Sequence, residues 1–362
     1  MIFFLPSYVL IIIAFSISFI ITFYGIPSVI KIARIKNLYD VPGYRASHHE
    51  LTPRLGGTMI FAGVILASVL FTGTENPFEI KYIISGLLIL FFIGLKDDIV
   101  SLQPYKKAIG QLTASVIIVV LGGIRITLNC GELAAPDSGC FFSLFLSIAV
   151  FMTLINSMNF IDGIDGLAAG VGIIASVFFG IYFILNEQLS IATICFALTG
   201  SLMAFFWYNA FSKNYKIFLG DTGSMVIGFL LAVFMIQFIE FNGSANARYP
   251  VVVAPSLALA ILIVPVFDLF RIVLVRIFHG KSPFYGDRNH IHHVVLKLAG
   301  SHLKATSAIL AMNLLFVLLV LLFDFLGNGI LISFLLLISI VLSGLITFLH
   351  GRDKENLQQD RK

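Results

Sequence analysis

The chain has 362 residues, of which 59 % are hydrophobic and 12 % are charged, and its mean hydropathy is +1.00. This composition excludes a soluble globular protein, because such a domain could not hide so much apolar surface from water. The formal net charge is only +4, and nothing in the composition indicates a nucleic-acid partner. We therefore expect an all-α polytopic membrane protein surrounded by the lipid bilayer.

Apolar runs close to the ~20 residues that a helix needs to cross a bilayer predict about eleven transmembrane helices. The first run, Tyr8 to Tyr24, has no basic segment or small-residue cleavage site before it, so we expect it to be retained. Residues 1–350 then form a single membrane domain and residues 351–362 a polar tail. The predicted spans are 8–26, 56–72, 80–95, 108–123, 141–157, 167–186, 191–208, 223–240, 251–274, 305–323 and 329–349.

Lysine and arginine are concentrated in alternate loops of this arrangement. The opposite loops hold Arg125 and Arg248, with Lys81 at their edge. Because cytoplasmic loops carry the excess of basic residues, the N-terminus is predicted outside and the C-terminus in the cytoplasm, which requires an odd number of spans. The cytoplasmic set is Lys31, Lys36, Arg45, Arg54, Lys96, Lys106, Lys107, Lys213, Lys216, Arg276, Lys281, Arg288, Lys297, Lys304 and the tail from Arg352 to Lys362.

The first two cytoplasmic loops carry polar groups with two interpretations each. The loop from Asp40 to Gly57 holds Arg45 and His48 and could face an anion, although positive-inside charge alone explains it better. Asp97 and Asp98 end the third span, where adjacent carboxylates repel unless a cation lies beside them. A helix end that simply enters water is the alternative, weakened because acidic residues oppose the dipole of a helix C-terminus.

The most polar stretch within the apolar sequence is NSMNFIDGIDGLAAG, residues 156–170. Asn156, Asn159, Asp162 and Asp165 recur at every third position, and a glycine follows each aspartate. Carboxylates at the edge of the hydrocarbon layer are costly and usually functional. The glycines favour turns with exposed backbone over a smooth helix.

Two later segments continue the pattern on the same side. In FLGDTGS, Asp221 stands where the eighth span begins, which suits helix capping or phosphate binding, and Phe218 is placed to stack on a base or to lie in the interface. The last large loop contains His290, His292 and His293. Zinc lacks a suitable fourth ligand there, and hydrogen bonding to an anionic or sugar ligand fits at least as well.

The cysteines indicate little about function. Cys195 lies within a span and is expected to be a small core residue. Cys130 and Cys140 both fall in the outer loop after the fourth span, where a structural disulfide is left open.

All these polar clusters fall on the predicted cytoplasmic side. Carboxylates repel phosphates, but together with Mg²⁺ they attract them, because this ion binds one or two carboxylates plus phosphate oxygens. The residues therefore favour metal-assisted phosphoryl transfer between a cytosolic donor and a membrane lipid, with the active site on the cytoplasmic face. The alternative is a secondary transporter, although transport sites tend to lie near the bilayer midplane, at broken helices within repeats.

NSMNFIDGIDGLAAG, FLGDTGS, the Asp97–Asp98 pair and SPFYGDRNHIHH together resemble the bacterial polyprenyl-phosphate N-acetylhexosaminyl-1-phosphate transferases, in the branch of WecA and TagO that is related to MraY. The resemblance implies transfer of a sugar 1-phosphate, with N-acetylglucosamine favoured, from a UDP-N-acetylhexosamine to undecaprenyl phosphate, and release of UMP. Such a reaction initiates cell-envelope polysaccharides such as O-antigen. The resemblance also implies Mg²⁺, with Mn²⁺ as the alternative ion, the bacterial cytoplasmic (inner) membrane, and a homodimer.

The resemblance also implies roles for individual residues. The metal ligands would be Asp221, Asn159, Asp97 and Asp98, and the catalytic residues Asp97, Asp98, Asp162, Asp165 and His290. The substrate contacts would be Asn156, Asn159, Phe218, Arg45, His48, Arg288, His292 and His293. Two positions depart from the family pattern: Ala46 replaces a common lysine and Ser101 a common third acidic residue, which puts one diphosphate or lipid contact and one acidic ligand in doubt.

Overall fold

A computed structural model of the chain describes residues 6–39, 52–72, 77–127, 136–280 and 290–359. Within these ranges the regular secondary structure is entirely helical, which confirms the predicted all-α class. The helices are α1 (Ser7–Lys36), α2 (Gly56–Phe71), α3 (Pro77–Val100), α4 (Pro104–Val116), η2 (Ile117–Leu121), α5 (Pro136–Ile161), α6 (Leu167–Leu185), α7 (Leu189–Phe206), η3 (Trp207–Phe211), α8 (Gly220–Asn242), α9 (Ala254–Phe278), α10 (Ile291–Ala299), α11 (His302–Leu322), η4 (Asp324–Leu326) and α12 (Gly327–Gln359).

Each predicted span overlaps a helix; 108–123 covers both α4 and η2, and 191–208 runs from α7 into η3. The short amphipathic α10 is an addition that hydropathy did not predict. Among the described residues, 8 helices are long and apolar enough to cross a membrane, and Gly56–Phe71 is a shorter apolar helix. The protein is therefore a polytopic α-helical membrane protein. The number of spans and their orientation stay predictions.

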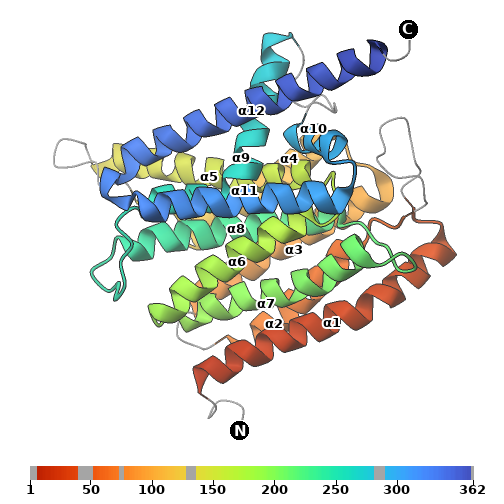
Figure 1. Ribbon diagram of the computed structural model, residues 1–362. Coiled ribbons are helices and arrows are strands. Elements are labelled where there is room, and N and C mark those ends of the chain that lie inside the picture. The colour runs from red at the N-terminus through yellow and green to blue at the C-terminus, as the bar shows by residue number, and fades with distance from the viewer. Residues whose placement is uncertain (1–5, 40–51, 73–76, 128–135, 281–289, 360–362) are drawn as a thin grey trace.

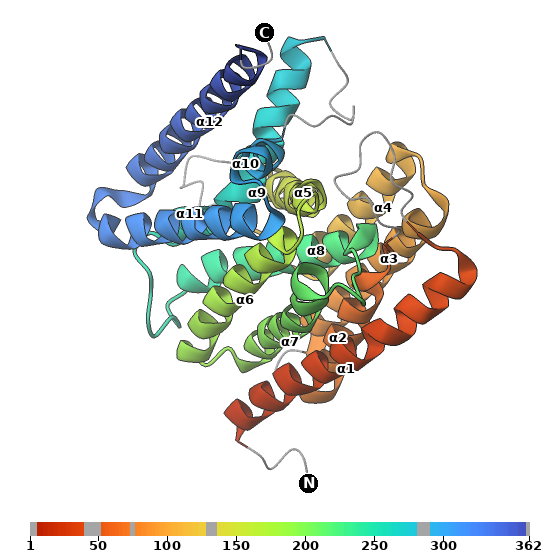
Figure 2. The same ribbon diagram turned by 45° about the vertical axis from the view of Figure 1, so that its right-hand side comes forward.

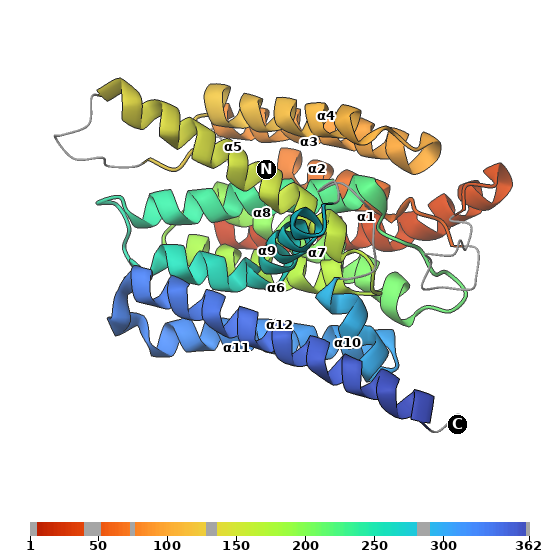
Figure 3. The same cartoon turned by 90° about the horizontal axis from the view of Figure 1, so that it is seen from above.

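The long helices lie side by side, and the two termini lie at opposite ends of the bundle (Figure 1). Seen from above, α3, α4 and α5 lie on one side, α10, α11 and α12 on the other, and α8 between them (Figure 3). The last part of α9, beyond Pro265, rises out of the bundle (Figure 2). The connections after α3, α5 and η3 meet at the end of the bundle where α10 lies (Figure 1).

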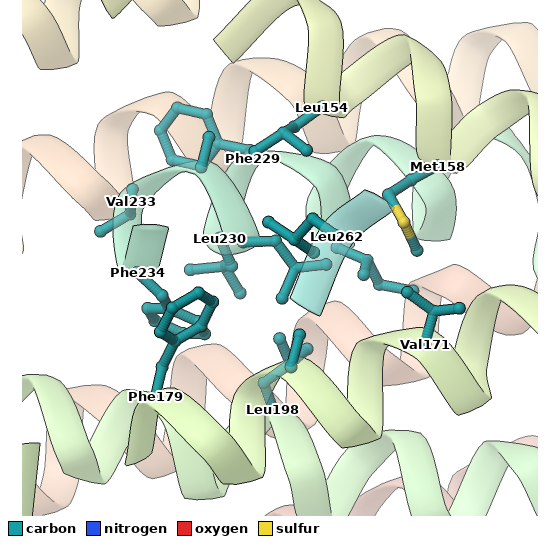
Figure 4. Close-up of a cluster of buried hydrophobic side chains, with 14 of the residues drawn as sticks. Leu154, Met158, Val171, Phe179, Leu198, Phe229, Leu230, Val233, Phe234 and Leu262 are labelled. Carbon is teal, nitrogen blue, oxygen red and sulfur yellow. The ribbon is translucent and has the colours of Figure 1, made fainter. Parts of the chain in front are cut away.

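Helix α8 forms the centre of the protein. It contacts α2, α3, α5, α6, α7 and α9. Its Phe229, Leu230, Val233 and Phe234 are fully buried and meet apolar side chains from four neighbouring helices (Figure 4). Since lipid is as apolar as these side chains, such packing depends on close van der Waals contact more than on exclusion of water. The position of α8 therefore also fixes the side chains at its N-terminus.

Glycines let neighbouring backbones approach α8. A Cβ added at Gly57 of α2 would lie 2.0 Å from the backbone nitrogen of Gly223, and one at Gly228 would lie 2.6 Å from Cα of Ile155 on α5. Small residues at helix contacts commonly allow this close approach in membrane proteins. The N-terminal part of α8 is thus held against α2 on one face and α5 on another.

Two boundaries differ from the expectation. The third helix continues past the predicted end of the third span, so that Asp97 and Asp98 lie within α3. The stretch 156–170 is mostly helical, and its non-helical part is confined to residues 162–166 between α5 and α6. The turns expected at the two Asp-Gly pairs are confirmed, and the helices on both sides extend to their edges.

Candidate active site at the N-terminus of α8

The N-terminus of α8 is built around Gly220 and Asp98. Gly220 has φ of 74°, and a Cβ there would lie 2.0 Å from the carbonyl oxygen of Arg54. This left-handed turn suits glycine. It brings the first N–H groups of α8 to Asp98, which accepts from the backbone nitrogens of Asp221 at 2.7 Å and Thr222 at 3.0 Å and from the Thr222 hydroxyl at 2.6 Å.

Asp98 therefore caps α8 from a different helix. A carboxylate at a helix N-terminus satisfies free N–H groups and complements the helix dipole. Asp98 lies beyond the predicted span 80–95, and burial raises its pKa to about 7, although its hydrogen bonds to Thr222 and Asp221 favour the ionised form. Its ligand capacity is thus largely used within the protein, which favours a positioning role over direct contact with a substrate.

Asp97, one residue earlier, faces a separate cluster around Lys107. The ammonium nitrogen of Lys107 on α4 lies 3.3 Å from Asp97 Oδ2 and is also paired with Asp221 Oδ1. The carboxamide oxygen of Asn159 is 3.5 Å from the same nitrogen. Four helices thus each contribute one side chain, and oxygen atoms of three of these side chains surround a single positive charge.

The carboxamide of Asn159 connects this cluster to the rest of α8. Its Nδ2 donates to Asp221 Oδ1 and, at 2.9 Å, to the hydroxyl of Ser224. Asn156, one helical turn earlier, instead donates to Gln111 Oε1 on α4 at 2.9 Å. Asn159 therefore lies in the cluster, whereas Asn156 braces α5 against α4.

Asp162 and Asp165 occupy the turn after α5 but have different surroundings. Asp162 is half-buried and has no hydrogen-bond partner within the described ranges; burial raises its pKa well above the ordinary value, and the Asp221 and Asp98 carboxylates raise it further. Asp165 Oδ2 pairs with Lys216 at 2.7 Å, and the backbone nitrogen of Asp165 donates to His302 Nδ1 at 3.2 Å. Asp162 thus belongs electrostatically to the acidic cluster, and Asp165 ties the turn to the segment before α8 and to α11.

The histidines meet on a buried aspartate of α9. His290 and His292 place Nδ1 at 3.2 Å and 2.9 Å from Asp268 Oδ2, and the backbone nitrogen of Ile291 donates to Asp268 Oδ1 at 2.9 Å. Arg271, three residues after Asp268 on α9, places a guanidinium nitrogen 4.0 Å from Asp268 Oδ1. Burial lowers the pKa of His292, which favours its neutral form.

These histidines reach the acidic cluster through Gly163. A Cβ added at Gly163 would lie 2.9 Å from His292 Nε2 and 2.9 Å from His293 Cε1. Gly163 follows Asp162 directly, so the turn 162–166 contacts the histidines and also carries the carboxylate that interacts with Asp221 and Asp98. The structure therefore brings the histidines and the acidic cluster, both predicted from sequence, to one end of the bundle.

Phe218 lies just before α8 in a segment held by backbone pairing. Its nitrogen donates to the carbonyl of Pro53 at 2.8 Å, and its carbonyl accepts from Gly56 at 2.9 Å. The ring is half-buried, with Lys216 Nζ 5.8 Å from its centroid. A stacking role for Phe218 stays a prediction. Arg45, His48, Arg288 and Cys130 lie outside the described residues, so the predicted contacts of the first three and the disulfide are not tested.

Three contributors were missed by the sequence analysis. Lys107 was counted only as positive-inside charge, no site role was predicted for Asp268, and Gln111 was not noticed. Lys107 and Gln111 are one helical turn apart on α4, on the face towards α5 and α8. A helical-wheel comparison would have separated half-buried Lys107 from exposed Lys106. Nothing local connects Asp268 with histidines more than twenty residues later.

The side chains around Lys107 could hold a divalent cation. Asp97, Asp221 and Asn159 offer carboxylate and amide oxygens, which are the ligands that hard cations such as Mg²⁺ prefer. The ammonium of Lys107 marks the position where the protein already stabilises positive charge. The cluster of Asp268, His290 and His292, whose ligand atoms lie within 4.8 Å of one another, also has metal-binding residue types, but its contacts have hydrogen-bond distances and partners.

Residues 80–239, which run from α3 into α8 and include the Lys107 cluster, match the family described as Glycosyl transferase family 4. The undecaprenyl-phosphate alpha-N-acetylglucosaminyl 1-phosphate transferase of Yersinia pestis is 31 % identical to the chain over 272 residues, which cover 74 % of this chain and 72 % of that protein. The chain belongs to glycosyl transferase family 4.

Other members of glycosyl transferase family 4 show similar coverage. The enzyme of the same name from Escherichia coli strain K12 is 28 % identical over 274 residues, covering 74 % of this chain and 71 % of that protein. The decaprenyl-phosphate N-acetylglucosaminephosphotransferase of Mycobacterium leprae is 29 % identical over 309 residues, covering 78 % and 76 %. The family predicted from the four motifs is thus confirmed.

Proposed function

We propose that the protein transfers N-acetylglucosamine 1-phosphate from UDP-N-acetylglucosamine to undecaprenyl phosphate in the bacterial cytoplasmic membrane and releases UMP. The names of the relatives support the transferred group and the polyprenyl phosphate acceptor. The observation that carries the proposal is the meeting of Asp97, Asn159 and Asp221 on one positive charge at the end of a membrane bundle. Such a site is suited to a diphosphate donor and a lipid acceptor together.

In this proposal Asp221, Asp97 and Asn159 hold Mg²⁺, with Mn²⁺ as the alternative ion. When bound, the ion would supply stabilisation of the negative charge that develops on the phosphate of the leaving UMP. Lys107, whose amine lies between the same oxygens, would turn towards the donor diphosphate. Asp98 keeps the start of α8, and therefore Asp221, in place through its three hydrogen bonds.

The acceptor needs little activation by the protein. A phosphate monoester has a second pKa of about 6, so it is largely a dianion at neutral pH and is already a nucleophile. We therefore propose that undecaprenyl phosphate attacks the β-phosphorus directly, and that Asp97 positions the reactants and does not remove a proton. Isolation of an aspartyl adduct carrying the phosphosugar, from a quenched reaction without acceptor lipid, would overturn direct attack.

A polytopic secondary transporter is the second candidate. Its carboxylates would be expected near the bilayer midplane at broken helices. Here Asp97, Asp162 and Asp221 stand at or beyond helix ends, at the end of the bundle that carries α10. This placement favours the transferase.

The deciding experiment is donor turnover by the purified protein in detergent with undecaprenyl phosphate, Mg²⁺ and a panel of UDP-sugars. We expect UMP release with UDP-N-acetylglucosamine, abolished by EDTA and by Asp221→Asn. Lys106→Met is the control, because Lys106 is exposed on the same helix turn as Lys107. Absence of UMP release with every donor, from folded protein with lipid present, would contradict the proposal.

A further inference from the structure

We infer that Asp268 is a positioning residue that fixes His290 and His292 in one tautomer, so that His292 presents an acceptor nitrogen to the sugar donor. The inference rests on the proposed function and adds a residue and a hydrogen-bond direction to it. Three buried side chains carry it: Asp268 on α9, and His290 and His292 at the start of α10.

The first step is the ionisation of Asp268. The side chain is nearly inaccessible, with 3 % of the residue surface exposed. Its two oxygens accept from the Ile291 backbone and lie within hydrogen-bond distance of two imidazole nitrogens. A carboxylate with three donors around it is an acceptor, and burial without these donors would be costly. Asp268 is therefore ionised and receives all three bonds.

The second step is the tautomer of the histidines. Because Asp268 Oδ2 can only accept, the facing Nδ1 atoms of His290 and His292 must both carry hydrogen. In a neutral imidazole the other nitrogen, Nε2, then has a free lone pair. His292 is 3 % exposed, and its burial disfavours a second proton. Its Nε2 is therefore an acceptor.

The third step is the surroundings of that Nε2. Within the described residues it is a buried nitrogen without a hydrogen-bond partner. It faces Gly163, where a Cβ would lie 2.9 Å away, beside the turn that carries Asp162. Because buried polar atoms are normally paired, an unpaired one at this place indicates that a ligand group is its partner.

The hydrogen-bond direction selects the ligand group. An acceptor nitrogen needs a donor, which a sugar hydroxyl or the N–H of an N-acetyl group provides. An ionised phosphate oxygen is itself an acceptor and is excluded as the partner of neutral His292. The structure thus assigns His292 to the hexosamine part of the donor and leaves the diphosphate to the cationic side chains. Gly163 allows the backbone of the turn to approach this nitrogen, since a Cβ there would lie 2.9 Å from it.

Replacement of Asp268 by asparagine tests the inference. The carboxamide can place its NH₂ group against Nδ1, which favours the opposite tautomer. We expect Asp268→Asn to raise the KM for UDP-N-acetylglucosamine at least tenfold with the KM for undecaprenyl phosphate within twofold of wild type. Asp324→Asn, an exposed aspartate in η4 at the other end of the bundle, is the matched control.

A pair of substitutions at His292 separates positioning from folding. His292→Asn retains a donor at the place of Nδ1 and lacks Nε2, so we expect a stable protein with the raised donor KM. His292→Gln retains a group near Nε2 and loses the contact with Asp268, so we expect lower stability. Nitrogen NMR of protein with labelled histidine should show two Nδ1–H tautomers in wild type that are absent in Asp268→Asn.

The outcomes distinguish the inference from the proposed function. A wild-type protein without UMP release would refute the function, whereas the NMR signature would still test the tautomer. Equal rises in both KM values in a folded Asp268→Asn protein, or an unchanged donor KM in His292→Asn, would overturn the inference while the function stands.

Discussion

Replacement of Lys107 by methionine should convert an internally neutralised acidic cluster into one that depends on added metal. The Lys107 ammonium is 3.3 Å from Asp97 Oδ2, and the two side chains are 16 % and 12 % exposed. At an effective dielectric constant of about 20, this separation corresponds to about 5 kcal/mol of attraction. Desolvation offsets part of it, but removal of one partner from a buried pair typically costs about 3–5 kcal/mol.

The assay is thermal unfolding in detergent, with EDTA or with Mg²⁺. Lys107→Met should melt below wild type in EDTA, because Asp97 and Asp221 then repel each other. A bound ion at one hundred times its Kd restores about 2.7 kcal/mol, so Mg²⁺ should recover much of this loss. Wild type must first displace its own ammonium, so its gain from Mg²⁺ should be smaller. Removal of about 3 kcal/mol of competition by the Lys107 ammonium should make Mn²⁺ binding to Lys107→Met about 100-fold tighter than binding to wild type.

Lys106→Met is the control for this prediction, because Lys106 is exposed and lies over the ring of Tyr105 at 5.8 Å. It should behave as wild type in both buffers. Equal stabilisation by Mg²⁺ in Lys107→Met and wild type would refute the reasoning, since the ammonium and the ion would then not share one site.

Three further predictions concern the framework of the site. Gly57→Ala should destabilise the protein by about 1–3 kcal/mol and reduce UMP release, because the new Cβ would meet the Gly223 backbone at 2.0 Å; Gly243→Ala, whose nearest neighbour is 3.6 Å away, should change neither melting temperature nor turnover. Asp98→Asn should cost about 1–3 kcal/mol in denaturation experiments, because its NH₂ group faces donors at the start of α8, and Asp324→Asn should not. Lys216→Met should remove the ion pair of the Asp165 carboxylate and increase hydrogen exchange in residues 162–166. Lys213→Met, an exposed neighbour, should leave exchange there unchanged. Unchanged exchange in Lys216→Met would contradict a role of the ion pair in holding this turn.

The sequence predicted the helices well because their apolar runs are long and their ends are marked by polar loops. It also predicted that the aspartates of the site converge on one membrane face, since the positive-inside rule places their loops on one side. These are Asp97, Asp98, Asp162, Asp165 and Asp221. It could not predict how Asp97 and Asp98 divide their roles. These neighbours differ by about 100° around α3, so one faces Lys107 on α4 and the other the start of α8.

Two further relations depended on tertiary structure. The burial of Lys107 is decided by which face of α4 packs against α5 and α8, and the paired lysines are equivalent in a hydropathy profile. Asp268 looked like half of a local ion pair because Arg271 is three residues away, yet α10 brings two imidazoles closer than the guanidinium. A short amphipathic helix after a long polar loop was the missing element.

The central place of α8 has a consequence for biosynthesis. The helix contacts α2, α3, α5, α6 and α7, all of which leave the ribosome before it, and carries Asp221 at its leading end. A nascent chain that stops before Gly220 therefore has Asp97, Lys107 and Asn159 but lacks α8, the helix on which these side chains meet. Such a chain would present glycine-lined helix faces to lipid and to other chains. Entry of this one helix would bring Asp221 to Asp97, Lys107 and Asn159 in a single step, before α9, which also packs on α8, has been made.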